Sequence, residues 1–242
     1  MSKLPNAPLL EVVFELTWDN RNKNELKDFQ YLHGDLYSKL KHKYPDRISL
    51  VPPEVPYEVL IKKVVHQFRK SKNGYPLFQV GPGILTLNTI DDEYYWEVFY
   101  NNASELLNAF IDVNPFDENK NYHPNLNYYD FFPFDFENQN VYDYLNKKFN
   151  ITFKQNFLNV EVNPNGLNIG FYYKTSLGNI NVNFRRGKAH NRDGIVLQTK
   201  LLGQAYKLNK DALLSWLSEA HKFCSETFKN LTEGELYESF KK

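Results

Sequence analysis

The chain opens with two prolines followed by a regular alternation of apolar and polar side chains, and this pattern constrains the fold most. Pro5 and Pro8 stiffen the lead-in. Apolar side chains then occupy every second position, at Val12, Phe14, Leu16 and Trp18. Successive residues of a strand point to opposite faces, so this period of two predicts a strand with one buried face. Because proline cannot donate a ladder hydrogen bond, the two prolines mark where the strand begins.

The composition excludes several classes of protein. A chain of 242 residues can bury a substantial core, as one domain or as two closely packed lobes. Its 29 basic and 29 acidic side chains balance, so no net charge draws it to nucleic acid or to a membrane. Cys224 is the single cysteine, which excludes an intramolecular disulfide. Without a signal sequence or about 20 successive apolar residues, we expect a soluble, cytoplasmic protein.

Helical periodicity recurs along the chain. Apolar side chains follow the helical period over residues 26–44, 96–110, 141–149 and 209–231. Asn209 is the predicted N-cap of the last of these helices. We expect this helix to bury an aromatic and aliphatic stripe, and that stripe includes Trp216, Phe223 and Phe228. The spacing of Thr232 and Glu235 is that of a capping box and predicts a short terminal helix.

Short apolar runs separated by turn residues predict the remaining strands. They cover residues 64–69, 77–80, 84–88, 126–134, 157–162, 167–173, 180–184 and 195–202. Each half of the chain therefore has the order strand, helix, antiparallel meander, helix. We predict an α+β fold whose antiparallel sheet is covered on one face by long helices, principally residues 91–112 and 209–231. Residues 1–115 and 116–242 would form two similar lobes, packed tightly enough to act as one domain.

Several segments resemble a known family in order along the chain. The matching segments are residues 4–16, the central run 78–88, Trp96 with Phe99, residues 126–130 and the closing helix 213–232. They resemble the sporadically distributed, uncharacterised prokaryotic family whose members begin with a Leu-Pro-x-x-Pro motif before an apolar strand containing Glu-Val. That family supplies no catalytic residues. Its patchy occurrence implies genes that move horizontally, as in antiviral defence or toxin–antitoxin loci.

The strongest polar feature is a basic run before residue 193. It consists of Arg185, Arg186, Lys188, His190 and Arg192 in a predicted hairpin loop. Guanidinium groups bind phosphates bidentately, and neighbouring tyrosine rings could stack on a base, so the run is a candidate anion or nucleic-acid site. The alternative is a solvated hairpin whose charges prevent pairing between sheet edges.

A second segment interleaves aromatic rings with acids. Phe132, Phe134, Asp135 and Phe136 are candidate partner-binding residues, since rings can anchor a basic partner surface. The alternative is an edge strand with buried rings and solvated acids.

No catalytic or metal-binding motif stands out. The six histidines include neither His-Glu-x-x-His nor His-x-His, and no cofactor or metal is expected. Asp193, Gln198 and Lys200 superficially resemble a nuclease pattern, but they lie on one strand rather than on two. His221 is expected to pack or to form hydrogen bonds, and Cys224 to act as a small apolar side chain.

Two hypotheses for function remain open. In the first, the protein is a non-catalytic binding component with a protein partner encoded nearby. In the second, it is a sensor or hydrolase that responds to a nucleotide or nucleic acid through residues 185–192.

Overall fold

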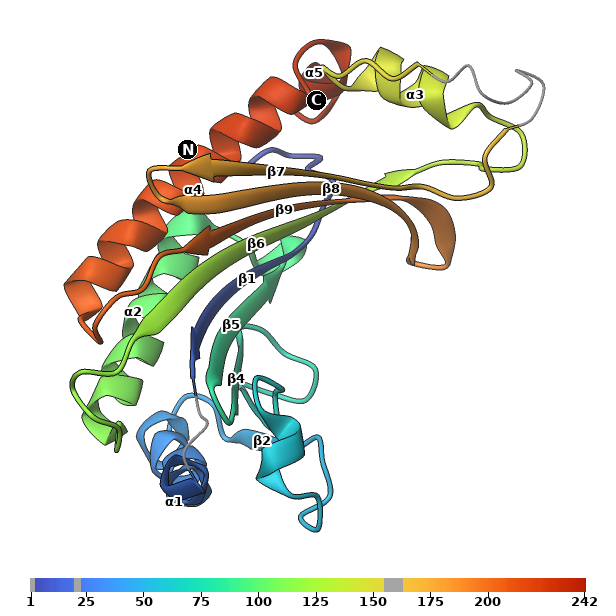
Figure 1. Ribbon diagram of the computed structural model, residues 1–242. Helices are drawn as coiled ribbons and strands as arrows, with labels where there is room; N and C mark the ends of the chain where they lie inside the picture. The colour runs from blue at the N-terminus through green and yellow to red at the C-terminus, as the bar shows by residue number, and fades with distance from the viewer. Residues whose placement is uncertain (1–2, 20–22, 155–162) are drawn as a thin grey trace.

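The alternating strand at the start of the chain lies in the middle of one antiparallel sheet (Figure 1). The computed structural model describes residues 3–19, 23–154 and 163–242. The strands are β1 (Leu9–Trp18), β2 (Asp46–Ser49), β3 (His66–Arg69), β4 (Leu77–Gly81), β5 (Ile84–Ile90), β6 (Tyr122–Pro133), β7 (Asn168–Thr175), β8 (Gly178–Ala189) and β9 (Arg192–Gly203). Their order in the sheet is β2-β3-β4-β5-β1-β6-β9-β8-β7. The first strands of the two halves, β1 and β6, are therefore neighbours at its centre.

Within the described residues, helices and short 3-10 turns lie between these strands and after the last of them. They are α1 (Lys23–Leu40), η1 (Tyr57–Leu60), η2 (Asp91–Glu93), α2 (Trp96–Val113), α3 (Val141–Lys148), α4 (Lys210–Leu231) and α5 (Glu235–Ser239). The predicted N-cap of the long last helix is confirmed, because the Asn209 side chain accepts a hydrogen bond from the Ala212 N–H at 2.9 Å. An N-cap of this kind satisfies one of the donors that a helix start leaves unpaired.

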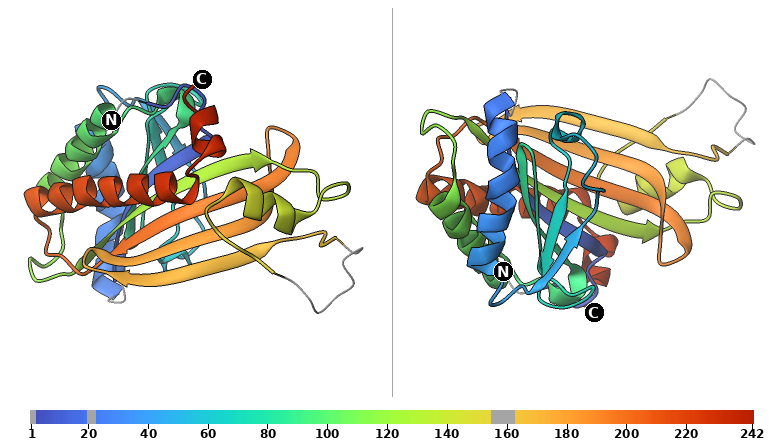
Figure 2. Two further views of the ribbon diagram at one scale, coloured as in Figure 1. Left: turned by 90° about the horizontal axis from the view of Figure 1, so that it is seen from above. Right: turned by 90° about the horizontal axis from the view of Figure 1, so that it is seen from below.

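The apolar side chains of β1 lie on the face of the sheet that the long helices contact. Trp18 is fully buried, and its ring centroid lies 5.2 Å from that of Phe110 in α2. The ring of Phe68 in β3 also packs against a helix, because its centroid lies 5.4 Å from that of Tyr37 in α1. Contacts also join α4 to β6 and β9. The ribbon views show α1, α2 and α4 beside one another on this side of the sheet (Figures 1 and 2).

The class predicted from the sequence is confirmed, since the structure combines an antiparallel sheet with helices. The sheet runs without a break from β2 to β7, so strands from both halves of the chain share it. Among the helices of the described residues, none is long and apolar enough to span a membrane.

Several details predicted from the sequence were wrong. The predicted capping box at Thr232 does not form, because the Thr232 hydroxyl donates back to the Phe228 carbonyl at 2.8 Å and Gly234 precedes α5 instead. Phe223 and Phe228 are only partly buried and lie at the margin of the core. The predicted helix 91–112 begins later, at Trp96, because the chain first forms η2. The predicted strand 157–162 lies outside the described residues.

Candidate functional site: the open face of the sheet

The face of the sheet opposite the long helices is polar at its centre, and we call it the open face. Strand alternation places Glu11, Val13, Glu15 and Thr17 of β1 on this face, because their neighbours point into the core. Residues that are directly opposite each other in neighbouring strands share a face. Asn127 of β6 lies opposite Val13, so it is also on the open face. The register therefore brings polar residues from distant parts of the chain together.

Side-chain hydrogen bonds cross the open face from β3 to β1. Gln67 Nε2 donates to Gln79 Oε1 at 3.0 Å, and Gln79 Nε2 donates to Thr86 Oγ1 and Asn88 Oδ1 at 2.9 Å each. Asn88 Nδ2 then donates to Glu11 Oε1 at 2.7 Å. A carboxylate on the central strand is thus fixed by a chain of amides that extends over three neighbouring strands.

A similar arrangement continues on the other side of β1. Asn125 Nδ2 donates to Glu15 Oε1 at 2.9 Å, and Lys200 Nζ lies 3.9 Å from the same oxygen. Gln198 Nε2 of β9 donates to the Tyr129 hydroxyl at 3.0 Å. Strands β6 and β9 therefore extend the network, and Glu15 is held by an amide and an ammonium group together.

The floor of this face is nearly closed to solvent although its side chains are polar. Thr86, Asn88, Asn125 and Asn127 are between 3 and 8 % exposed. Buried amides are costly unless they are hydrogen-bonded. The contacts above meet that requirement for Asn88 and Asn125, and Asn127 Oδ1 accepts a hydrogen bond from Gln198 Nε2 at 3.4 Å. Such a network holds its donors and acceptors in fixed positions. The open face is therefore a rigid polar surface rather than a set of mobile solvated chains.

This geometry keeps the two central acids of the open face apart. Glu11 and Glu15 are four residues apart on one strand, which separates them by about 13 Å at roughly 3.3 Å per residue. The paired carboxylates of glycosidases lie only about 5–9.5 Å apart. Asp193 of the nuclease-like pattern lies on the opposite face of β9 from Gln198 and Lys200, because its position has the other parity. The three side chains therefore do not converge.

The basic run forms strands rather than the loop predicted from the sequence. Strand β8 continues to Ala189, and β9 begins at Arg192, so only His190 and Asn191 form the turn. Both turn residues have positive φ, at 50° and 60°, as a tight two-residue hairpin requires. Backbone pairing between β8 and β9 therefore extends through most of the basic run. The charges of these residues do not indicate that they pair as strands.

Strand alternation divides the basic side chains between the two faces. Arg185 and Arg192 have the parity of the open face, whereas Arg186 and Lys188 have the opposite parity. Arg186 is already engaged in a bidentate ion pair with Asp193, which raises the pKa of the guanidinium. Arg185 forms no ion pair with any other described residue. Only part of the predicted anion site is therefore brought to the open face.

The aromatic residues proposed for partner binding are buried. Phe132, Phe134 and Phe136 are each 3–4 % exposed, which favours the packing alternative. The Asp135 carboxylate accepts hydrogen bonds from the N–H groups of Glu137 and Asn138. The hydrogen bond from the Asn138 amide is the main cause that lowers the pKa of Asp135. Phe132 thus belongs to β6, and the Asp135 carboxylate stabilises the turn that follows this strand.

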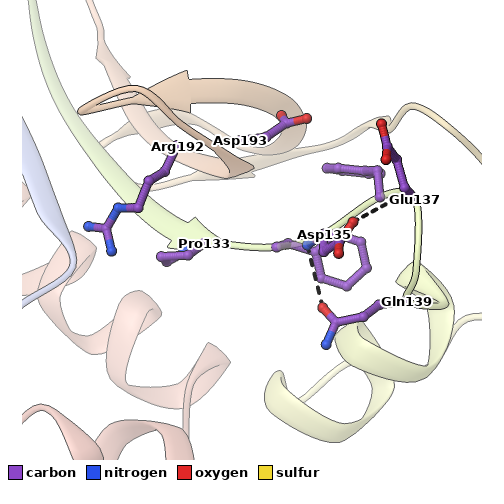
Figure 3. A pocket seen from close by; sticks show the side chains of 8 residues that line it. Pro133, Asp135, Glu137, Gln139, Arg192 and Asp193 are labelled. Atoms are coloured by element: carbon purple, nitrogen blue, oxygen red, sulfur yellow. Dashed lines mark hydrogen bonds between the residues drawn. The ribbon is translucent and has the colours of Figure 1, made fainter.

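A hollow of about 460 Å³ lies beside this turn (Figure 3). It is lined by acids from two segments, Asp135 and Glu137 near α3 and Asp193 at the start of β9, and by Arg192. Figure 3 shows the hydrogen bonds that tie Asp135 to the turn. Two of the carboxylates of this hollow, those of Asp135 and Asp193, therefore already have partners within the protein.

His221 packs and forms a hydrogen bond, as expected. Its ring stacks on Trp96 with centroids 3.8 Å apart, and its Nδ1 lies 2.8 Å from the Tyr128 hydroxyl. Burial is the main cause that lowers the pKa of His221 to about 4, so it is neutral at pH 7. Burial also raises the pKa of the Cys224 thiol to about 12, which leaves it unreactive. This cluster is a joint between α2, α4 and β6.

A second histidine cluster joins α1 to β3. The rings of His33 and His66 lie 4.1 Å apart, and Arg47 Nη2 lies 2.8 Å from His33 Nδ1. The pKa of each histidine is lowered to about 4, and burial is the main cause for both. The charge of Arg47 is the second cause for His33, whereas His33 and then Arg47 follow burial for His66. Both rings are therefore neutral near pH 7. Within the described ranges, no cluster of three or more His, Cys, Asp or Glu side chains is arranged to hold a metal ion.

Sequence reasoning missed the central residues of the open face. The signal was present, because asparagine is depleted in strands and yet Asn125 and Asn127 occupy alternate positions of one strand. An alternating polar side normally indicates only exposure to water. What the sequence could not show is that Glu11 and Glu15 would lie next to these amides.

No family model matches this chain, and no curated protein or solved structure matches it either.

Proposed function

We propose that the protein is a non-catalytic binding component and that the open face of its sheet is the binding surface. The proposal includes membership of the sporadically distributed prokaryotic family that the opening segment resembles, and a partner protein encoded nearby. The observation that carries it is the hydrogen-bonded amide floor around Glu11 and Glu15.

The energetics of the floor support this proposal. Asparagine is a poor strand former, so each buried Asn on the open face costs stability relative to a β-branched residue. The amides do not offset this by filling the apolar core, because they lie on the other face of the sheet. What they provide is a fixed position for the Glu11 and Glu15 carboxylates, to which Asn88 and Asn125 donate. Fixed groups bind a partner with a smaller loss of conformational entropy than mobile ones.

The chemistry of the face indicates the chemistry of the partner. Carboxylates accept hydrogen bonds and do not donate them, so Glu11 and Glu15 select donors. The half-buried Tyr129 ring between β1 and β9 offers an aromatic contact beside these acids. We therefore expect a protein segment that presents lysine, arginine or amide side chains. Groups of opposite charge at the centre of the surface would set orientation and specificity.

Val13→Arg tests this function directly. Val13 lies between Glu11 and Glu15 on the open face and contributes only an apolar side chain. An arginine there should project from the centre of the surface, block the partner and leave the melting temperature almost unchanged. The measurement is affinity purification of the tagged protein from its native host, followed by mass spectrometry of the proteins retained.

A matched variant makes the outcome decisive. Tyr31 is 71 % exposed on α1, on the side away from the open face, so Tyr31→Arg adds the same charge elsewhere. We expect one protein at near-equal molar ratio with the wild type and with Tyr31→Arg, and its loss with Val13→Arg. Retention of that protein by all three would contradict the assignment of the surface.

Arg185 supports a second candidate function, which is binding of an anionic ligand such as a nucleotide or nucleic acid. It is exposed on the open face, and its charge reaches Tyr129, whose pKa it lowers against a larger rise caused by burial. Arg185→Gln should weaken binding of single-stranded RNA in filter assays at low salt, whereas Arg186→Gln should not, because Arg186 is paired with Asp193. Binding of the wild type should also fall by roughly tenfold or more over a severalfold rise in salt. A wild type that retains no RNA at low salt would exclude this function.

A further inference from the structure

Strand β7 forms one end of the sheet, and a row of its backbone groups pairs with no other described strand. The Arg186 N–H donates to the Leu167 carbonyl at 2.9 Å, which fixes the phase of the ladder between β7 and β8. In an antiparallel ladder, alternate residues point their N–H and C=O groups to opposite sides. The groups of Asn168, Gly170, Tyr172 and Lys174 therefore point away from β8. Figure 2 shows β7 along the margin of the molecule, with no described strand or helix beyond it (left view).

The two ends of the sheet differ in how they resist pairing. The end strand β2 has only four residues and follows Pro45, and short strands and prolines discourage further pairing. Strand β7 has eight residues, with Lys174 as its single charge. Tyr172 and Tyr173 are 70 % and 58 % exposed, so they leave apolar rings in solvent. A long end strand with few charges is the usual template for another strand.

The sequence of β7 is complementary to itself in antiparallel orientation. The register that pairs every outward N–H and C=O group is centred on Phe171, which then faces its own copy. In this register Gly170 lies opposite Tyr172, and Asn168 lies opposite Lys174, so no like charges meet. An aromatic side chain across from a strand glycine covers the backbone that the glycine exposes. Ile169 falls opposite Tyr173, which adds an apolar pair.

We propose that two copies of this chain associate through β7, related by a two-fold axis at Phe171. The association continues the sheet from one copy into the other. A two-fold contact of this kind is closed, so it forms a dimer and does not propagate. The open faces of the two copies then lie on the same side of one extended sheet. This inference is independent of the partner proposed for the open face.

The first test measures mass against concentration, by size-exclusion chromatography with light scattering from low micromolar to submillimolar protein. We expect twice the mass of a single chain at the upper end. Tyr172→Pro removes an outward N–H and leaves the ladder to β8 intact, so it should yield a monomer that still folds. Tyr172→Val keeps the N–H and the strand propensity, and should remain a dimer. A monomeric wild type over the whole range overturns the proposal, as does a dimeric Tyr172→Pro variant.

The second test measures the register by oxidative cross-linking. At the two-fold axis, the copies of residue 171 form a pair without direct hydrogen bonds, with their Cα atoms about 4.5 Å apart. This separation suits a disulfide, so Phe171→Cys should form a covalent dimer on a non-reducing gel. The copies of Lys174→Cys would be about 20 Å apart along the strands and should not cross-link. The native Cys224 is buried and should not interfere. Cross-linking of the second variant in place of the first overturns the register.

Discussion

Trp18→Ala should lower the free energy of unfolding by about 3–5 kcal/mol, the loss typical of a fully buried aromatic side chain. Trp18 has no exposed surface, and it ends the central strand where α2 crosses the sheet. Its ring lies 5.2 Å from Phe110 and 5.7 Å from both Phe116 and Tyr122. Proteins of this kind are stable by only about 5–15 kcal/mol, so the change removes a large part of the margin.

The conservative substitution Trp18→Phe separates two effects on the free energy of unfolding, the loss of ring packing and the loss of the indole N–H. The Trp18 Nε1 atom has no hydrogen-bond partner among the described residues, so it already carries a desolvation cost. Trp18→Phe keeps a ring in place and removes that atom, and we expect it to change stability by only about 1 kcal/mol. Urea denaturation followed by circular dichroism measures both variants. A loss below about 1 kcal/mol for Trp18→Ala would show that the site is not the centre of the core.

Asp130→Asn should stabilise the protein at pH 8 and have little effect near pH 4. Asp130 is 5 % exposed, and burial, followed by the charge of Asp91, raises the pKa of its carboxyl from 3.8 to about 7. This difference corresponds to at most about 4 kcal/mol at 1.36 kcal/mol per pKa unit. The asparagine side chain has a similar size and no charge, so it avoids the cost of burying an ionised group.

The direction of this pH dependence follows from proton uptake by Asp130 on folding. Between about pH 7 and pH 4 the folded protein holds a proton on Asp130 that the unfolded chain has released. Falling pH in this window therefore stabilises the wild type through this group, whereas the asparagine variant gains nothing. The advantage of Asp130→Asn should be largest above pH 7 and vanish toward pH 4. Urea denaturation at several pH values measures this difference, and the exposed Asp92→Asn variant serves as the control. A difference that stays constant across the range would contradict the assignment to Asp130.

The core was largely predictable because it depends on local periodicity. The alternation at Val12, Phe14, Leu16 and Trp18 correctly predicted a strand with one buried face, and these side chains are at most 1 % exposed. Helical spacing also predicted the long last helix and its Asn209 cap. The same rule overextended the buried stripe to Phe223 and Phe228, which are only partly buried at the margin of the core. Phe223→Ala is therefore expected to cost less than Trp18→Ala.

Sequence alone determined which residues of each strand and helix face the core, because side-chain direction follows from backbone geometry and repeats every two or 3.6 residues. The tertiary structure decided which strands became neighbours, since pairing depends on contacts between segments that are distant in the chain. Asn125 reaches Glu15 across 110 positions, and Asn88 reaches Glu11 across 77. No local pattern encodes such a distance. The sequence of β1 thus determines that one side of this strand is polar. The amide floor forms only because the sheet places β5 and β6 on either side of β1.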